Sequence, residues 1–414
     1  AGTTGGATIT ATGNFTLTSD LTATGAGSKI LTLAATSTGS AITSLIVDHD
    51  GSNTTGVTKT GTGTWTLGGS SSNTYTGDTL ITGGTLRLGK SGGATAIAGN
   101  VTIGDGTGTD TLQLTAANQL ASTSAVTLAA AGTPVFNLNG FSETIGSLSS
   151  ANAAASVALG SPGSATTFTV GDANNTTFAG VISGGANAVL DKVGPGTLTL
   201  SGANTYAGTT TISAGVLAVQ HASALGSTAR STTVAAGAAL QLSNVITAAE
   251  PLFLNGTGVA ADGALRSIVG NNTFAGAVTL SSAARINADA DTLTLSGTVT
   301  SANHALTVGG GGDTTLSANL SLGTGTLTKD GAGTLLLSGS TGTVGQVSLA
   351  AGTLSIGGST TLNTAEFTSA GSSTLTIASG GTVAASYAAT NTNFNGILAG
   401  DGIFAATGTA ANAG

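Results

Sequence analysis

Three stretches of the chain repeat the same order of residues. They lie at 57–89, 189–219 and 327–357. Each begins with a lysine and a Gly-x-Gly turn, continues with a short strand (TWTL, TLTL or TLLL), and ends with two further strands around a glycine. The lysines, Lys59, Lys192 and Lys329, are 133 and 137 residues apart. Internal repeats of this kind predict a fold built by stacking similar units, each of which is too small to bury its own apolar face.

Between the repeats the chain continues as alternating strands of four to six residues, such as FTVGD and TLTIA, bounded by Gly, Asn, Asp or Ser. Helix signals are nearly absent; the segment 219–226 reads equally well as a single turn or a loop. We therefore predict an all-β fold, a single-stranded right-handed parallel β-helix (β-solenoid), forming an elongated rod over residues 1–414 as one continuous domain. A coil of roughly 20–25 residues gives about 16–20 coils.

The composition excludes several classes of partner. Only 6% of the residues are charged, the formal net charge is −8, and nine Lys and Arg are scattered along the chain. Nucleic acid needs a basic stripe, so we expect no nucleic-acid partner. No apolar run approaches the ~18 residues of a membrane helix, so we expect no membrane insertion by this segment. The absence of Cys is compatible with export and with a cytoplasmic location.

Acidic and basic residues form a few local clusters. Asp191–Lys192 and Lys329–Asp330 are read as ion-pair dyads in solvated turns, because they recur at one position of the repeat. The segment IVDHDGSNTTG holds Asp48, His49, Asp50 and Asn53, which is typical of a polar turn. Its oxygen ligands leave calcium binding at Asp48 and Asp50 open, although the bidentate Glu of an EF-hand is missing.

Other candidates for chemistry are weaker. GDGTGTD, with Asp105 and Asp110, is read as a Gly/Asp turn of the same kind. Asp289 and Asp291 are two residues apart at a strand edge, so they are expected to face one side, with Arg285 nearby. The three histidines, His49, His221 and His304, have no zinc spacing. We therefore assign no catalytic, cofactor-binding or metal-binding residue and predict that the chain is not an enzyme.

The aromatic residues follow the repeat. Tyr75 and Tyr206 occupy the same place in NTYTG and NTYAG, which favours packing at a coil corner over stacking on a sugar. Trp65 stands where the other units have Leu198 and Leu335, which predicts a position in the core or at its rim.

The segments VTKTGTGTWTLGG, VLDKVGPGTLTLSGANTYAGTTTISAGVL and LTKDGAGTLLLSG resemble the autotransporter-associated β-strand repeat, which is found in passenger domains of bacterial autotransporters and adhesin-like surface proteins. The resemblance covers about a quarter of the chain and implies a secreted right-handed β-helix, without implying an activity. The third unit departs from the pattern, with STGTVG at 340–345, and we expect a different loop there. We also expect this chain to lack the translocator barrel of a complete autotransporter.

Two functions from different classes follow. The first is an exported structural or adhesive protein at the bacterial cell surface or outside the cell: a fibre, filament or self-associating passenger in a biofilm matrix. Its partners would be further copies of itself, through lateral or end-to-end association, and surface glycans. The alternative is a carbohydrate-active enzyme or glycan-binding module on the same scaffold, which would need carboxylates converging in an external groove.

Overall fold

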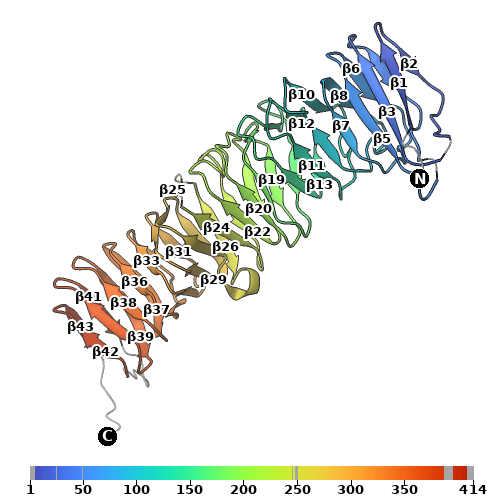
Figure 1. The fold of residues 1–414 in the computed structure, drawn as a ribbon. Helices are drawn as coiled ribbons and strands as arrows, with labels where there is room; N and C mark the ends of the chain where they lie inside the picture. Colours follow the sequence, from blue (N-terminus) through green and yellow to red (C-terminus); the bar gives the residue numbers. More distant parts are fainter. Residues whose placement is uncertain are drawn as a thin grey trace. The chain divides into compact units, whose positions relative to one another are not determined.

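The computed structural model describes residues 5–24, 26–48, 50–244, 246–247, 250–386 and 395–407. It divides into two compact units, residues 1–210 and residues 211–414. In each unit short parallel strands lie side by side in coil after coil, which confirms the predicted all-β solenoid (Figure 1). Among the described residues the only helix is one 3₁₀ turn, η1 (Val259–Ala261).

The first unit has two regular parallel sheets. In addition, strands β13 (Glu143–Ile145), β16 (Thr167–Val170) and β19 (Val189–Lys192) pair along a third side, and β17 (Thr176–Phe178) pairs with β20 (Thr197–Leu200). Strand β21 (Thr209–Ile212) lies at the boundary of the units. One sheet contains β1 (Gly5–Ala11), β3 (Lys29–Ala35), β5 (Thr55–Thr60), β7 (Thr79–Ile81), β9 (Val101–Ile103), β11 (Ala125–Leu128) and β14 (Ser147–Ser149). The other contains β2 (Thr16–Leu17), β4 (Ser40–Ile42), β6 (Thr64–Leu67), β8 (Gly84–Leu88), β10 (Asp110–Leu114), β12 (Val135–Asn137), β15 (Ser156–Ala158) and β18 (Val181–Ser183).

The second unit has three columns of stacked strands. Two columns are joined because the long strands β29 (Val278–Ala288), β37 (Thr341–Leu349) and β39 (Thr361–Ser369) run through both. One adds β22 (Val216–Val219), β24 (Ala239–Ser243), β27 (Leu265–Val269), β32 (Leu306–Gly309) and β35 (Thr326–Lys329). The other adds β23 (Thr232–Val234), β26 (Leu252–Gly256), β31 (Val299–Ser301), β34 (Leu320–Ser321), β41 (Thr382–Ser386) and β43 (Ile403–Thr407). The third is β25 (Ile246–Thr247), β28 (Asn272–Phe274), β30 (Thr292–Leu295), β33 (Asp313–Leu316), β36 (Thr334–Leu337), β38 (Thr353–Ile356), β40 (Thr374–Ile377) and β42 (Ile397–Ala399).

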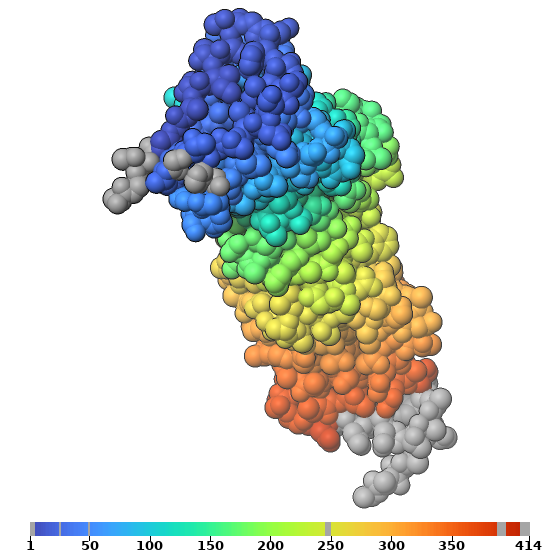
Figure 2. All heavy atoms as spheres, turned by 90° about the vertical axis from the view of Figure 1, so that its right-hand side faces the viewer, coloured from blue at the N-terminus to red at the C-terminus, as the bar shows by residue number. Residues whose placement is uncertain are grey.

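The core is a set of aliphatic stacks inside the coils. Strand side chains alternate between inside and outside, so TLTL and TLTI segments bury their Leu and Ile and leave Thr at the surface. Parallel register then places like residues above one another. Each coil therefore buries its apolar side chains against the next, and Figure 2 shows successive coils of each unit as adjoining bands of colour.

The length of a coil is read from the strand register. Partner residues are separated by as few as 19 positions, at Thr334 and Thr353, and by as many as 28, at Gly256 and Ala284. Most of the separations fall within the predicted period of roughly 20–25 residues. The segment 219–226 is a turn, as one of the two interpretations held. The hand of the coil and its continuity over 1–414 stay predictions.

Asn and Asp at the coil corners extend the pairing between strands. Their side-chain oxygens accept hydrogen bonds from backbone N–H groups of the following coil, as at Asn100–Ala125 (3.0 Å), Asn271–Thr292 (3.3 Å) and Asp313–Thr334 (2.7 Å). Corner residues leave the sheet ladder, so their backbone groups need other partners. These Asx contacts supply them and fix the stacking of neighbouring coils. No helix in the described residues has the length and apolar character to span a membrane.

Candidate functional site

The repeat lysines are buried, so the prediction of solvated turns was wrong. Lys59, Lys192 and Lys329 are 0%, 1% and 2% exposed, at inward positions of β5, β19 and β35. Lys59 Nζ donates to the carbonyl oxygens of Thr60 (2.9 Å), Gly61 (2.8 Å) and Gly83 (2.7 Å). Three donors meet three carbonyls from two coils, so the lysine clamps the Gly-x-Gly turn onto its neighbour.

The other two lysines repeat this arrangement. Lys192 Nζ donates to Val193 O (2.7 Å) and Gly194 O (3.0 Å), and Lys329 Nζ to Asp330 O (2.6 Å) and Gly331 O (2.9 Å). Adjacent residues in a strand point to opposite faces, so Asp191 lies on the outer side while Lys192 points inward. We call these lysines and the carbonyls they bind the lysine clamps.

Burial opposes the charge of these ammonium groups. It lowers the pKa of Lys59 and of Lys192 to about 8, while Asp110 acts on Lys59 in the opposite direction. It lowers the pKa of Lys329 as well. Because the carbonyl partners are fixed by the turns, the clamps are structural devices within the coil and are closed to an external substrate.

The Asn-Thr-Tyr motif ties coils together. In the first unit, Asn73 accepts from Ile46 N (3.1 Å) and donates to Ala96 O (2.9 Å), which spans three coils. The same position in the second repeat, Asn204, accepts from Ile182 N (2.8 Å). Both asparagines are 3% exposed. Sequence reasoning noticed the motif but missed this role, which the shared Asn beside the shared Tyr could have signalled.

The aromatic residues of the repeats are buried where they were predicted, the two tyrosines between strands at a coil corner and Trp65 in the core. Tyr75 and Tyr206 are fully buried, and their hydroxyls hydrogen-bond to Thr79 Oγ1 (2.9 Å) and Thr210 Oγ1 (2.6 Å). Trp65 is also fully buried, and its Nε1 donates to Ala34 O (3.1 Å). Since none of these rings reaches the surface, none of them can stack on a sugar.

The third repeat has a different loop, as predicted. Where the other units carry the Asn-Thr-Tyr turn, residues 341–349 form the single long strand β37. Gly345 lies in the middle of this strand, at the corner where its pairing changes from one column to the other. A Cβ there would collide with the backbone of Thr324, so glycine is required at this corner.

The cluster around Asp48 is a polar turn. The Asp48 carboxylate accepts from Thr55 N (2.6 Å), Thr76 N (3.0 Å) and Thr76 Oγ1 (2.6 Å), and Asp50 accepts from Ser52 N (2.8 Å). Asn53 Nδ2 also donates to Asp50. His49 lies outside the described residues. The carboxylates are thus occupied by turn and inter-coil hydrogen bonds, and calcium binding here stays an open hypothesis.

The Asp105–Asp110 turn has one exposed and one buried carboxylate. Thr107 donates to Asp105 through N (2.9 Å) and Oγ1 (2.8 Å), which lowers the pKa of Asp105. Asp110 is 3% exposed, and burial raises its pKa. In the part of the chain that the structure describes, no group of three or more His, Cys, Asp or Glu is placed to hold a metal ion.

Asp289 and Asp291 do not face the same side, so that prediction was wrong. Strand β29 ends at Ala288, and Asp291 has a φ of 53°, which turns the chain out of the extended conformation. The Asp289 carboxylate pairs with Arg266 (2.7 Å), which the sequence did not identify, and Asp291 accepts from Gly270 N (2.7 Å). The Asp289 carboxylate therefore forms an ion pair, and the Asp291 carboxylate forms a hydrogen bond with the backbone of a different residue.

Arg285 pairs instead with Asp330. The two side chains meet at 2.7 Å although their residues are 45 positions apart, because Arg285 reaches over the intervening coil at Gly309. A Cβ on Gly309 would collide with both Arg285 and Asp330. This ion pair ties three coils together: the Asp330 carboxylate pairs with Arg285, whereas Lys329 Nζ donates to the Asp330 backbone carbonyl.

Two glutamates are buried, one in each unit. Glu143 accepts from Gln119 N (2.7 Å) and Thr144 N (3.1 Å), and Glu250 accepts from the Thr232 hydroxyl. Burial raises the pKa of each to about 7. Because the folded pKa lies above the ordinary value of 4.5, their stabilising effect is complete below about pH 4.5 and is lost as the pH rises through about 7. The two carboxylates do not share a site.

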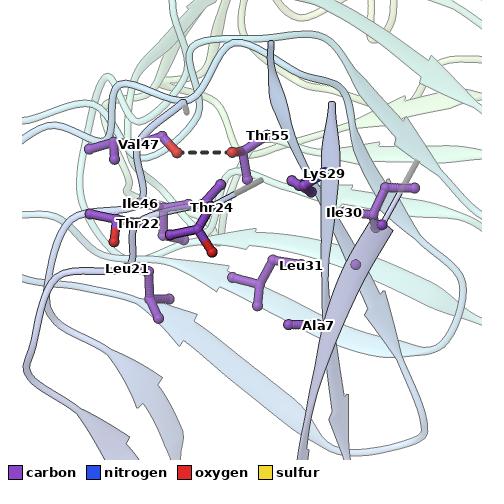
Figure 3. A pocket seen from close by; sticks show the side chains of 13 residues that line it. Ala7, Leu21, Thr22, Thr24, Lys29, Ile30, Leu31, Ile46, Val47 and Thr55 are labelled. Atoms are coloured by element: carbon purple, nitrogen blue, oxygen red, sulfur yellow. Dashed lines mark hydrogen bonds between the residues drawn. The ribbon is translucent and has the colours of Figure 1, made fainter. Parts of the chain in front are cut away.

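A groove of about 460 Å³ lies in the first coils (Figure 3). Its apolar lining includes Leu21, Leu31 and Ile46, and Thr55 Oγ1 donates to Val47 O (2.9 Å) at one side. The groove exists because Ala7 occupies the stack position of Leu31 and leaves the space unfilled. It contains no carboxylate, and it is the open interior of a coil.

A second, shallower groove lies in the second unit at the corner between its two joined columns. Its volume is about 370 Å³, and no charged side chain lines it. We call it the corner groove; its lining comes from four successive coils, at 323–324, 343–345, 363–365 and 384–386.

Rows of mainly hydroxyl side chains form part of the outer surface of both units. Parallel register stacks outward residues of successive strands, and these rows carry no charge. We call them the threonine rows. The first unit has Thr8, Thr32, Thr58, Leu80, Thr102, Thr127 and Ser149; the second has Thr273, Thr294, Thr315, Leu336, Ser355 and Thr376, and also Thr279, Thr300, Ser321, Thr343, Asn363 and Ala384.

Comparison with known proteins identifies the repeats. A family model described as the passenger-associated-transport-repeat matches residues 57–88, 190–219 and 327–356, within one residue of the units seen in the sequence. The chain is 35% identical over 149 residues to an adhesin, the BmaC autotransporter of Brucella suis biovar 1 (strain 1330). The match covers 36% of this chain and 4% of the adhesin, so the chain spans a small part of that relative. No solved structure matches the chain. The chain thus carries three passenger-associated-transport repeats on a parallel solenoid, and these repeats together with the similarity to the adhesin support an autotransporter passenger-type repeat protein.

Proposed function

We propose that the chain is an exported, adhesin-like surface protein that works without catalysis, as a structural surface for cell–cell or matrix contact. The single observation that supports this most is the threonine rows. They present uncharged hydroxyl and methyl groups at the coil spacing of about 4.8 Å, over six or seven successive strands. Such rows offer many weak contacts and little electrostatic repulsion.

The partner we propose is a second copy of the chain. A face of six four-residue strands measures roughly 13 Å by 29 Å, from about 3.3 Å per residue and 4.8 Å per strand. Two such faces bury only about 800 Å² in total, below the ~1,200 Å² of a specific stable complex. One pair of rows would therefore associate weakly, and adhesion would arise from several rows or several molecules acting together.

The charge distribution is consistent with that partner. A net charge of −8 would oppose association if it were spread over every face. In the second unit, however, Arg266, Arg285 and Glu366 lie on the column that contains β27 and β35. The threonine rows of the other two columns carry hydroxyl, amide and aliphatic side chains, and the exposed Asp313 lies in the row beside the one that contains Thr315. Neutral rows can approach each other without bringing like charges together.

Display on a non-adherent bacterial host tests the proposal. Cells carrying the wild-type chain should settle from suspension, and cells carrying Thr32→Lys with Thr102→Lys should settle more slowly, since each outward lysine brings like charges together between copies. Ser71→Lys, at an exposed bend residue off the rows, is the control for charge alone. Settling at the wild-type rate by the double variant, with equal amounts at the surface, would contradict the proposal.

A further inference from the structure

The corner groove has the size and lining of a binding site for a flexible, uncharged ligand. Its volume of about 370 Å³ lies at the lower end of the ~300–1,000 Å³ of small-molecule sites. Four successive coils contribute, and at about 4.8 Å per coil the first and last are about 14 Å apart. The groove therefore runs along the coil axis and fits a short linear chain better than a compact molecule.

The polar groups along the groove both donate and accept hydrogen bonds. Thr343 and Asn363 are exposed and stacked in register, and each offers a hydroxyl or an amide to the groove. A second row in register follows the lining residues of each coil by one or two positions. It consists of Thr326, Gln346 and Glu366. Gln346 Nε2 donates to Glu366 Oε2 (3.0 Å), which holds the two planar groups in fixed orientations beside the groove.

The lack of positive charge in the lining disfavours an anionic ligand. Among the described residues, no Lys, Arg, Asp or Glu lines the groove, and the charged member of the second row, Glu366, is an anion. An anionic ligand would find no cation there, and a carboxylate would repel it. Sugar hydroxyls, by contrast, pair with hydroxyl and amide groups in both directions.

We propose that the corner groove binds a neutral, linear oligosaccharide, with Thr343 and Asn363 as the contacting side chains. This site differs from the homotypic contact proposed above, because it is a concave corner and uses hydrogen bonds to a ligand that is not protein. It shares Thr343 and Asn363 with one threonine row of the second unit, whereas the homotypic contact is tested through Thr32 and Thr102 in the first unit. The groove is shallow, and none of the described residues that line it is aromatic, so the expected Kd for a tetrasaccharide is on the order of 0.1–1 mM.

The test is ligand-observed saturation-transfer NMR on the purified chain, at a concentration where it is monomeric, so that failure of self-association does not affect the result. The probes are neutral tetrasaccharides of glucose, mannose, galactose and N-acetylglucosamine, with tetragalacturonate as the anionic comparison. We expect saturable binding of at least one neutral probe and at least tenfold weaker binding of the uronate.

Two variants locate the site. Thr343→Lys should weaken binding at least tenfold, and the matched Thr376→Lys, which is outward on β40 and away from the groove, should leave binding unchanged. Asn363→Ala should weaken binding severalfold. It provides a second test of the site if Thr343→Lys lowers the melting temperature of the chain. The proposal is overturned if no neutral probe binds saturably, if the uronate binds equally well, or if Thr343→Lys and Asn363→Ala both bind like the wild type.

Discussion

Replacing Lys59 by Met tests the role of the lysine clamps. Met keeps the unbranched apolar stem within the stack between Leu33 and Ile81, but it removes all three N–H donors. The carbonyl oxygens of Thr60, Gly61 and Gly83 then lose their partner. We expect the coils around residues 55–88 to become less stable.

The magnitude follows from two opposing effects. An unsatisfied buried acceptor costs about 1–3 kcal/mol, and three of them give up to about 3–9 kcal/mol before relaxation. In the opposite direction, removing the buried charge removes its desolvation penalty of several kcal/mol. Water that reaches part of an opened turn can also hydrogen-bond to the exposed carbonyl oxygens. We therefore expect a net local destabilisation of about 2–4 kcal/mol, because the clamp bonds are short and lie within two coils that are otherwise intact.

Native-state hydrogen exchange is the appropriate assay, since a stacked repeat array need not unfold as a single two-state unit. Amides of β5, β6 and β8 should exchange about 30- to 1,000-fold faster in Lys59→Met, with amides of the second unit unchanged. Lys29→Met, at a partly exposed lysine of β3, is the control and should have a smaller effect. Unchanged or slower exchange in Lys59→Met would refute the clamp, because it would mean that the buried charge costs more than its hydrogen bonds contribute.

Three other predictions concern single residues. Glu250→Gln should remove the part of the stability loss between about pH 4.5 and about pH 7 that comes from Glu250, while the part from Glu143 remains, which gives a difference of up to about 3 kcal/mol between the two proteins at pH 8, measured by urea melts; parallel pH profiles would contradict it. Thr314→Val should stabilise by about 1 kcal/mol, because the buried Thr314 hydroxyl has no partner among the described residues, and a lower melting temperature would oppose this. Gly309→Ala should separate Arg285 from Asp330 and destabilise, and combining it with Asp330→Asn should add little, so full additivity in a double-mutant cycle would count against the shared contact.

Much of the fold could be predicted from the sequence, because the structural repeat of a solenoid appears as a repeat of residue types along the chain. The Lys, Gly-x-Gly and TLTL order gave the repeat boundaries, and alternation in strands such as TLTI placed Leu and Ile inside. The alignment of Trp65 with Leu198 and Leu335 alone placed it in the core or at its rim, and the structure shows it in the core.

The errors concern polar residues whose partners are distant in the sequence. Lysine is ordinarily a surface residue, and nothing local shows that Lys59 faces carbonyls from its own turn and from Gly83. Asp289 finds Arg266 only through the stacking of coils, and the positive φ of Asp291 breaks the alternation that placed both carboxylates on one side. The corner groove was not predicted either, since it depends on four coils bending at one place.

The central claim is that the neutral threonine rows form contacts between copies of the chain. Sedimentation velocity of the purified chain at neutral pH, from micromolar to near-millimolar concentration, tests it most directly. We predict concentration-dependent association in the wild type, and a shift of that association to at least tenfold higher concentration in Thr32→Lys with Thr102→Lys. A single monomeric species over the whole range would contradict the claim, as would association unaffected by the two lysines.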